Sequence, residues 1–295
     1  MTDTTFSDET VALGPYAVHR LGFGAMQLPG PGVMGPPRDR DEALAVLRRA
    51  VELGVDHIDT AQYYGPDVAN ELIREALHPY PEGLALVSKV GAVRDAKGGW
   101  PPAQQPAELR AGVEENLRSL GVEQLAAVNL RVLDPMRGYT PPPFEDQLAE
   151  MVALRDEGKI AGIGVSNVDL DQLDTAIRLA GVVCVQNAYS LLDRSSEPVL
   201  QRCEAEGIAF VPFFPLGSAF PGTPKVTENA AVIELADQLG ATEAQVGLSW
   251  LLHHSPNILL IPGTKSLAHL EENMATASLP LTADQLAELG AATTP

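Results

Sequence analysis

The chain has 295 residues and an acidic composition, with 39 aspartate and glutamate residues, 20 lysine and arginine residues and a formal net charge of −19. A charge of this sign repels the phosphate backbone of a nucleic acid and an anionic membrane surface, so neither is expected as a partner. The acidic residues are spread over expected helices such as 145–157 and 284–288, which indicates a solvated ring of helices.

A short β-hairpin is expected around Gly14 and Pro15. Beyond it, brief apolar runs alternate with longer amphipathic stretches, which is the pattern of repeated βα units. The apolar runs mostly lack polar alternation, as expected for parallel strands that are buried on both faces. The expected strands span residues 21–26, 56–59, 84–89, 125–130, 160–165, 182–186, 208–213 and 258–261.

Helical periods fill the intervals between the strands, for example at Leu44, Leu47 and Val51. Eight parallel strands can close into a barrel or lie open in a doubly wound sheet, which usually carries the glycine loop GxGxxG after its first strand. The segment LGFGAMQLPG does not have that spacing. We therefore predict an α/β fold, a single (β/α)8 TIM-barrel domain over residues 1–295 with an N-terminal β-hairpin and extra helices near the C-terminus. Its site residues are expected at the carboxyl ends of the strands.

Two expected loops are long, the Gly/Pro-rich 29–37 and 91–105, which contains Trp100. Long loops at a barrel mouth usually shape a substrate site, so Trp100 is a candidate substrate contact, with ordinary loop packing as the alternative. The segment 214–227, rich in glycine and proline, is interpreted as a flap that folds over a bound ligand.

The chain contains only two cysteines, Cys184 and Cys203, in an apolar run and an expected helix. This usage predicts no disulfide framework and no paired-cysteine metal site, and it is typical of a reducing cytoplasm. The start, MTDTTFSDET, lacks a basic segment that leads into an apolar one, and no run of about eighteen apolar residues occurs, so we expect no export signal and no membrane span. His253 and His254 are adjacent on an expected helix and point apart, so we interpret them as surface residues and expect no metal.

Three polar side chains fall where a barrel places its active site. Asp59 ends the second expected strand, Tyr64 follows in the next loop, and Lys89 ends the third expected strand. Desolvating a lone ion is costly, so Asp59 and Lys89 are expected to face each other, either for catalysis or as a stabilising pair alone.

Tyr64 is the expected proton donor. A phenol titrates near pH 10, so it needs a nearby cation to favour its phenolate. At roughly 4 Å and an effective dielectric of about 20, Lys89 would attract that phenolate by about 4 kcal/mol, or about three pKa units as an upper limit. We therefore expect Lys89 to bring the pKa of Tyr64 closer to the working pH, with Asp59 offsetting part of the effect.

Six segments, in chain order HIDTAQYYG, VSKV, GVSNV, VQNAYSLL, PFFPLG and IPGTKSLAHLEEN, resemble the signature segments of the aldo-keto reductases across the whole chain. The resemblance implies NADPH-dependent reduction of an aldehyde or ketone to an alcohol. It also implies that Asp59, Tyr64 and Lys89 are three of the family's four catalytic residues. The fourth is normally a histidine that ends the fourth strand. Here Arg131 occupies that place, and an arginine stays protonated and cannot be the acid.

The same resemblance implies a nicotinamide site. Ser166, Asn167 and Gln186 carry the hydroxyl and amide groups needed to hold a carboxamide, and Phe213 offers a flat face for stacking. The other residues assigned to the cofactor in this part of the chain are Gly24, Ala25, Met26, Asp59 and, for the pyrophosphate, Leu216, Gly217 and Ser218.

A further part of the implied cofactor site lies after the last strand. A helix N-terminus with a lysine binds anions readily, and here it resembles the family's pocket for the 2′-phosphate, so NADPH is expected over NADH. His269 stands where the family commonly has arginine, and Glu272 and Asn273 match positions that contact adenine. The residues assigned to the phosphate pocket are Gly263, Thr264, Lys265 and Ser266.

The segments GPGVMGPPRDR and VNLRVL resemble a bacterial branch of the family that is associated with reduction of pyridoxal to pyridoxine. Pyridoxal carries a phenolic oxygen beside its aldehyde, and the Arg131 guanidinium is suited to bridge both oxygens. The alternative is that Arg131 points away into a salt bridge.

Two other functions stay open at this point. A buried lysine at the end of a barrel strand is also the nucleophile of Schiff-base aldolases, although Asp59 should keep Lys89 charged. The second alternative is a non-catalytic NADPH-binding subunit of a larger assembly. The sequence does not indicate the oligomeric state.

Overall fold

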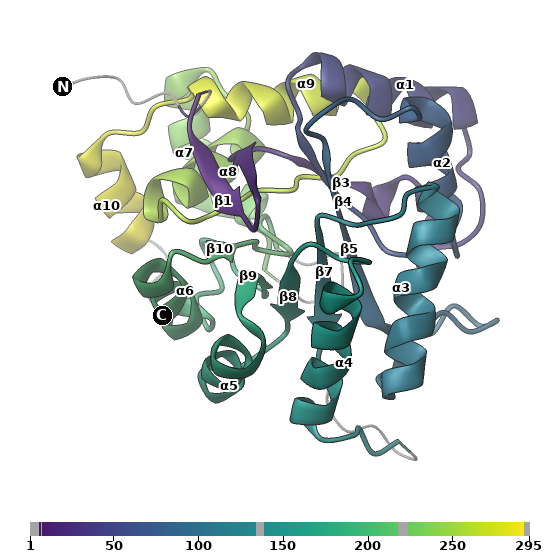
Figure 1. Cartoon of the computed structure of the whole chain (residues 1–295). Helices are drawn as coiled ribbons and strands as arrows, with labels where there is room; N and C mark the ends of the chain where they lie inside the picture. Colours follow the sequence, from purple (N-terminus) through teal and green to yellow (C-terminus); the bar gives the residue numbers. More distant parts are fainter. Residues whose placement is uncertain (1–5, 7, 134–138, 218–223, 292–295) are drawn as a thin grey trace.

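A curled sheet of parallel strands forms the centre of the molecule (Figure 1). The computed structural model describes residues 6, 8–133, 139–217 and 224–291. Along the main path of this sheet, the strands follow their order in the chain and each neighbouring pair is parallel. The strands are β3 (Phe23–Gly24), β4 (His57–Asp59), β5 (Ala85–Ala92), β7 (Ala127–Arg131), β8 (Ile163–Ser166), β9 (Val182–Gln186) and β10 (Ala209–Phe210).

Residues 257–260 close this sheet into a barrel. The Phe210 amide donates to the Asn257 carbonyl at 2.8 Å, and the Leu260 amide donates to the Arg20 carbonyl at 2.8 Å. Parallel bridges join Ile258 to Phe210 on one side and Leu260 to Leu21 on the other. The segment therefore joins β10 to the start of β3, and the predicted barrel is confirmed. The regular strands within 21–26 and 208–213 are shorter than expected.

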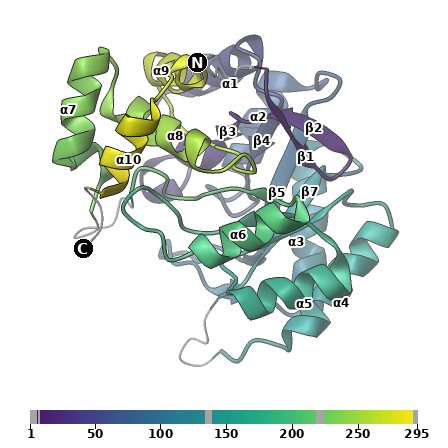
Figure 2. The same cartoon turned by 90° about the vertical axis from the view of Figure 1, so that its left-hand side faces the viewer.

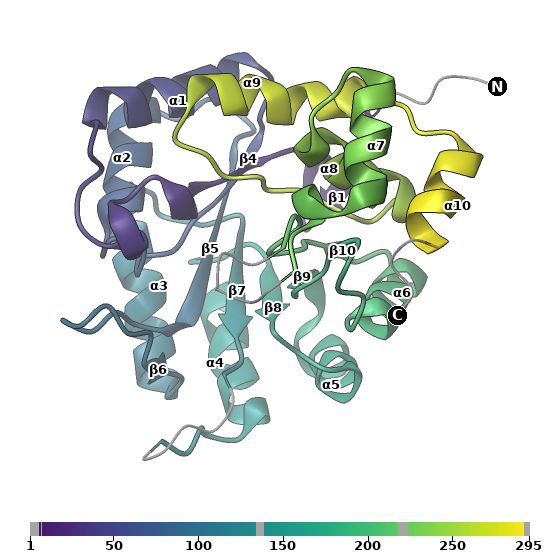
Figure 3. The same ribbon diagram turned by 180° about the vertical axis from the view of Figure 1, so that it is seen from behind.

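Helices surround the strands (Figures 1 and 3). Some of them begin at a side-chain cap: Asp39 accepts from the Glu42 amide at 2.9 Å before α1, and Asp169 accepts from the Gln172 amide at 2.8 Å before α5. The helices are α1 (Arg40–Glu52), α2 (Val68–Leu77), α3 (Pro106–Leu120), α4 (Phe144–Asp156), α5 (Leu170–Ala180), α6 (Glu197–Glu206), α7 (Ala230–Leu239), α8 (Glu243–His254), α9 (Leu267–Ala275) and α10 (Ala283–Ala291).

The predicted N-terminal hairpin is present and covers one end of the barrel. Strands β1 (Thr10–Leu13) and β2 (Tyr16–His19) pair antiparallel (Figure 2). Leu13 and Val18 of the hairpin share a buried cluster with Ala85 and Ala127, the first residues of β5 and β7. The hairpin therefore seals the amino ends of the strands and leaves the carboxyl ends for a site.

The expected loop 91–105 is partly a hairpin. Strand β5 continues beyond Lys89 to Ala92, because β6 (Pro102–Ala103) pairs antiparallel with Gly91–Ala92. Lys89 therefore lies within a strand instead of ending one.

His253 and His254, interpreted as surface residues, are each only partly exposed. His253 packs edge-on against Phe6 with 4.7 Å between ring centroids, and His254 stacks on Trp250 at 4.5 Å. Neighbouring segments cover the last turn of α8, so both rings are partly buried. Within the described part of the chain, no cluster of three or more His, Cys, Asp or Glu side chains is arranged to hold a metal ion. No described helix is both long and apolar enough to cross a bilayer.

Candidate active site

A buried ion pair lies at the inner end of the barrel mouth. Lys89 Nζ donates to Asp59 Oδ1 and also to the Thr60 carbonyl at 3.1 Å. Gln186, the last residue of β9, donates to the other oxygen of Asp59 at 3.1 Å. Asp59 and Lys89 are each 4% exposed, so the pair is largely withdrawn from water. These contacts fix both ions in one orientation.

Tyr64 stands beside this pair. It lies in the loop after β4, and Lys89 Nζ is 4.9 Å from the centre of its ring. Tyr63 packs edge-on against Tyr64 with 5.4 Å between ring centroids, and Trp100 does so at 6.2 Å. The structure thus brings a phenol, an ammonium and a carboxylate together, from the loop after β4, from within β5 and from the end of β4.

The electrostatics of Tyr64 differ from the expectation. Burial raises the pKa of Tyr64 above its ordinary value, Asp59 raises it further, and Arg131 lowers it in part. The expected shift toward neutral pH is therefore wrong in direction, because desolvation and the charge of Asp59 together outweigh the attraction of Arg131. The phenol keeps its proton at neutral pH. A phenol that carries its proton can donate a hydrogen bond to an oxygen of a bound molecule.

One cavity of about 560 Å³ runs from this trio toward α9. Its wall includes Asp59, Tyr64 and Lys89 at one end and residues of α9 at the other. The residues predicted to bind cofactor that line it are Gly24, Met26, Asp59, Gln186, Phe213, Leu216, Gly217, Gly263, Thr264, His269, Glu272 and Asn273. Phe214, Pro215 and Thr227, from the segment interpreted as a flap, also line the cavity. Lining residues outside the predicted cofactor set and that segment are Gln27, Pro212, Thr242, Glu243, Ala244, Ile261 and Pro262.

Two glycines shape the floor of this cavity. A Cβ on Gly24 would lie 2.5 Å from the Ile261 carbonyl oxygen, and one on Gly263 would lie 2.3 Å from the Gly24 carbonyl oxygen. The backbones after the first and last barrel strands therefore approach so closely that side chains are excluded. The result is a smooth cradle beside the start of α9, where Ser266 caps the helix and unpaired backbone amides favour an anion.

Several predicted cofactor residues do not line the cavity. Ser166 is buried in β8, and Asn167 donates its side chain to the Val132 carbonyl at 3.1 Å. Lys265 is exposed next to Thr264, at the rim. Those that lie off the cavity wall are Ala25, Ser166, Asn167, Lys265 and Ser266. Ser218 lies outside the described residues, as does part of the segment interpreted as a flap.

Arg131 ends β7 on the other side of Tyr64. Its charge lowers the pKa of both Tyr63 and Tyr64 against the effect of burial, which raises the pKa of Tyr63 to about 12. Its guanidinium therefore lies near the two tyrosines, and among the described residues no carboxylate lies within 4.0 Å of it. Gln104, which is fully buried, donates to the Arg131 carbonyl at 3.1 Å and fixes its backbone.

The two long loops meet over this side of the site. Trp100 packs edge-on against Tyr63 at 5.4 Å, and the Arg94 guanidinium lies 3.9 Å from the centre of the Trp100 ring. Arg94 also donates to the Gly32 carbonyl at 2.6 Å, which ties loop 91–105 to loop 29–37. Trp100 therefore stands at the mouth near Tyr64. No local pattern in the sequence indicated the roles of Arg94 and Gln104, because both depend on contacts between distant segments.

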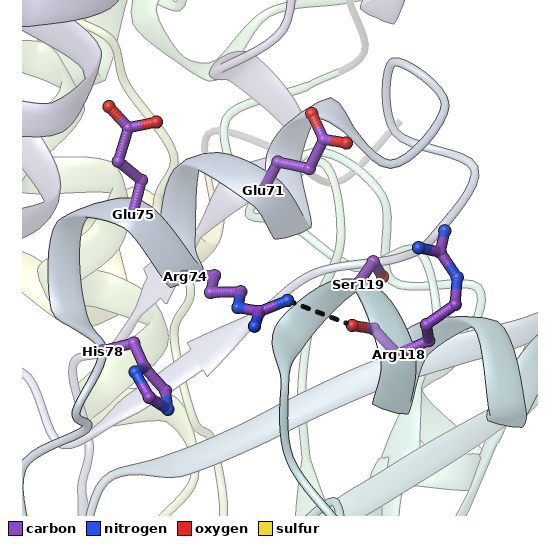
Figure 4. A pocket seen from close by; sticks show the side chains of 6 residues that line it. All are labelled: Glu71, Arg74, Glu75, His78, Arg118 and Ser119. Atoms are coloured by element: carbon purple, nitrogen blue, oxygen red, sulfur yellow. Dashed lines mark hydrogen bonds between the residues drawn. The ribbon is translucent and has the colours of Figure 1, made fainter.

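A second hollow, of about 380 Å³, lies between the outer faces of α2 and α3 (Figure 4). Two of its charged side chains form ion pairs: Glu75 binds Arg40, and Arg118 binds Glu115. Arg74 donates to the Arg118 carbonyl at 3.5 Å. This mixed and solvated surface is separate from the barrel mouth.

Comparisons with known proteins agree with this architecture. A model described as the aldo/keto reductase family matches residues 20–293. Pyridoxine 4-dehydrogenase of Escherichia coli (strain K12) is 48% identical over 284 residues, which are 96% of this chain and 98% of that protein. An uncharacterised oxidoreductase of Schizosaccharomyces pombe is 40% identical over 280 residues, covering 95% of this chain and 88% of its own. A crystal structure of an aldo-keto reductase from Klebsiella pneumoniae in complex with NADPH has a TM-score of 0.81 at 27% identity and covers 97% of this chain and 96% of that one.

Proposed function

The chain belongs to the aldo/keto reductase family, and on that basis we propose that it reduces an aldehyde or ketone to an alcohol with NADPH as the reductant. The observation that carries the proposal is the position of Tyr64 beside the Asp59–Lys89 pair, at one end of a cavity that continues to α9. The family match over 20–293 supports a single domain. The proposal places this domain in the cytoplasm, with a small carbonyl compound as its substrate.

The cavity fits a nicotinamide dinucleotide. The Gly24–Gly263 cradle excludes side chains where an extended ligand must lie against backbone, and Phe213 offers an aromatic face near Lys89. The α9 N-terminus with Thr264, and Lys265 at the rim, is suited to a 2′-phosphate. When bound, the reduced nicotinamide supplies a hydride. Ser166 and Asn167 stay predicted carboxamide contacts.

In the proposed reaction, Tyr64 donates a hydrogen bond to the carbonyl oxygen and then transfers its proton to that oxygen. The carbonyl carbon gains a hydride and the oxygen gains a proton, so the products are an alcohol and oxidised cofactor. Lys89 stabilises the phenolate left on Tyr64, and Asp59 holds Lys89 in place. Because Tyr64 is 4% exposed, solvent water has little access to the proton being transferred.

The direct test is an assay of NADPH and NADH consumption at 340 nm with pyridoxal, simple aromatic aldehydes and sugars. We expect faster consumption with NADPH and one molecule of alcohol formed per cofactor oxidised. Cofactor binding without consumption on any substrate would contradict the proposal and favour a non-catalytic subunit. A Schiff-base aldolase is disfavoured, because Lys89 Nζ is engaged by both Asp59 and the Thr60 carbonyl and is not free to attack a substrate carbonyl.

Pyridoxal is the substrate that we propose to test first. Pyridoxine 4-dehydrogenase of Escherichia coli, at 48% identity, is named for the corresponding alcohol. Arg131 lies near Tyr63 and Tyr64, so we propose that a substrate whose aldehyde approaches Tyr64 places a neighbouring phenolic oxygen near the guanidinium.

Replacing Arg131 by histidine should therefore lower kcat/KM for pyridoxal about tenfold more than kcat/KM for benzaldehyde, since only pyridoxal has an oxygen beside its aldehyde for the guanidinium to bind. Steady-state rates with both aldehydes measure the difference. Equal losses on both substrates would remove Arg131 from substrate selection.

Replacing Lys265 by methionine should raise KM for NADPH about five- to tenfold and leave KM for NADH nearly unchanged. An exposed lysine at the rim stabilises the 2′-phosphate, which NADH lacks, and solvent limits the size of the effect. Lys97→Met, an exposed lysine in loop 91–105, is the matched control. Equal changes in KM for NADPH and for NADH would show that Lys265 does not interact with the 2′-phosphate.

A further inference from the structure

A buried network of polar side chains lies between the sheet and helices α2 and α3. Thr60 Oγ1 donates to Asn70 Oδ1 at 2.8 Å, and Asn70 Nδ2 donates to Ser119 Oγ at 2.9 Å. Each member is at most 9% exposed. The members are Thr60, Gln62, Asn70, Ser88, Asn116 and Ser119.

Asn116 on α3 is the hub of this network. Its Oδ1 accepts from Ser88 Oγ at 2.6 Å and from Asn70 Nδ2 at 2.9 Å. Its Nδ2 donates to Gln62 Oε1 at 2.8 Å and to the Gly112 carbonyl at 2.8 Å. One side chain that is 0% exposed thus joins β5, α2, α3 and the loop after β4. All four hydrogen-bonding sites of the amide are in use.

Three members of the network, Ser88, Gln62 and Thr60, are chain neighbours of the proposed catalytic residues. Ser88 directly precedes Lys89, and Gln62 lies two residues before Tyr64. Thr60 follows Asp59, and its carbonyl accepts from Lys89 Nζ at 3.1 Å. Side chains alternate along a strand, so Lys89 points into the barrel while Ser88 points outward to α3. The network therefore contacts the catalytic strand and loop from the outer side of the barrel, opposite the side that carries the catalytic side chains.

Apolar side chains occupy the neighbouring positions in this layer. Leu86 and Val90, which flank Ser88 on the same face of β5, belong to the apolar core between sheet and helices. A fully hydrogen-bonded polar network fixes the relative positions of the elements that it joins. It seldom makes a protein more stable than apolar packing in the same place would. Gly112 lets α3 approach, since a Cβ there would lie 3.1 Å from Gln62 Nε2. The polar contacts therefore fix the positions of the loop after β4 and of strand β5.

We propose that Asn116 is a positioning residue for the reduction: it fixes the loop that carries Tyr64 against the strand that carries Lys89. The inference rests on the proposed function and deepens it. Asn116 touches neither cavity nor cofactor site, and it acts through Gln62, Ser88 and Asn70.

Replacing Asn116 by leucine keeps the volume and removes the four hydrogen bonds. We expect kcat to fall about 10- to 100-fold, because a displacement of about 1 Å at the reacting groups has an effect of that size. The Kd of NADPH should change less than about twofold. Amides of residues 60–65 should exchange with deuterium faster than in the wild-type protein.

Leu109→Ala is the matched control. Leu109 lies on the same helix, is 0% exposed and is outside the network, so this variant lowers the Tm without removing a hydrogen bond. The inference is supported when Asn116→Leu loses far more kcat than Leu109→Ala at comparable Tm. It is overturned when the two variants lose kcat in proportion to Tm, or when Asn116→Leu keeps the wild-type kcat.

Should Asn116→Leu fail to fold, Ser88→Ala and Gln62→Met each remove one contact of the hub and are judged against Leu109→Ala in the same way. Tyr64→Phe in the same assay separates the two levels of inference. Loss in Tyr64→Phe with wild-type kcat in the network variants overturns the role of Asn116 alone. An unchanged rate in Tyr64→Phe overturns the proposed function itself.

Discussion

Replacing Tyr64 by phenylalanine should lower kcat for carbonyl reduction by about 10²- to 10⁴-fold and leave the Kd of NADPH nearly unchanged. The change removes only the hydroxyl, so the ring still packs against Tyr63 and Trp100 while the proton source is lost. Rates at 340 nm with saturating aldehyde measure the first quantity. Titration of NADPH fluorescence measures the second.

Tyr63→Phe is the matched control for this experiment. Tyr63 is adjacent in sequence, 1% exposed and in ring contact with Tyr64, so its replacement perturbs packing to a similar degree. We expect it to keep most of the activity, because Tyr64 lies beside Lys89 and lines the cavity and Tyr63 does not line it. A loss in Tyr63→Phe as large as that in Tyr64→Phe would show that packing, not proton donation, explains both results.

The sequence predicted those features that depend on local pattern. Unbroken apolar runs indicated parallel strands buried on both faces, and polar residues at their ends pointed to the barrel mouth. Asp59, Tyr64 and Lys89 meet there because parallel strands share one edge. Gly24 and Gly263 were among the predicted cofactor residues. The need for glycine at both positions, a close approach of two backbones, appears only in three dimensions.

Features that depend on a balance of distant groups were not predictable. Burial and Asp59 raise the pKa of Tyr64, and Arg131 lowers it. The direction of the net shift depends on how deeply the phenol is buried, which only the fold shows. Arg94 joins two loops that are 60 residues apart in sequence. Asn116 looks like an ordinary polar residue of a surface helix, and only the fold reveals that it is fully buried behind the site.

Replacing Lys89 by methionine should have the largest combined effect on stability and activity. It leaves Asp59 buried without its cation, which destabilises a protein by about 3–5 kcal/mol, and it removes the charge that stabilises the Tyr64 phenolate. We expect kcat to fall by about 10²-fold or more. Urea unfolding and steady-state kinetics measure the two losses.

The double variant Asp59→Asn/Lys89→Met separates these effects. Removing both charges at once leaves no unpaired ion, so the free energy of unfolding should return to within about 1–2 kcal/mol of the wild-type value. The activity should stay lost, because a neutral pair offers nothing to the phenolate on Tyr64. Recovery of activity together with stability would show that the ion pair is structural alone. It would then assign to Arg131, the other cation that acts on Tyr64, the electrostatic role proposed for Lys89.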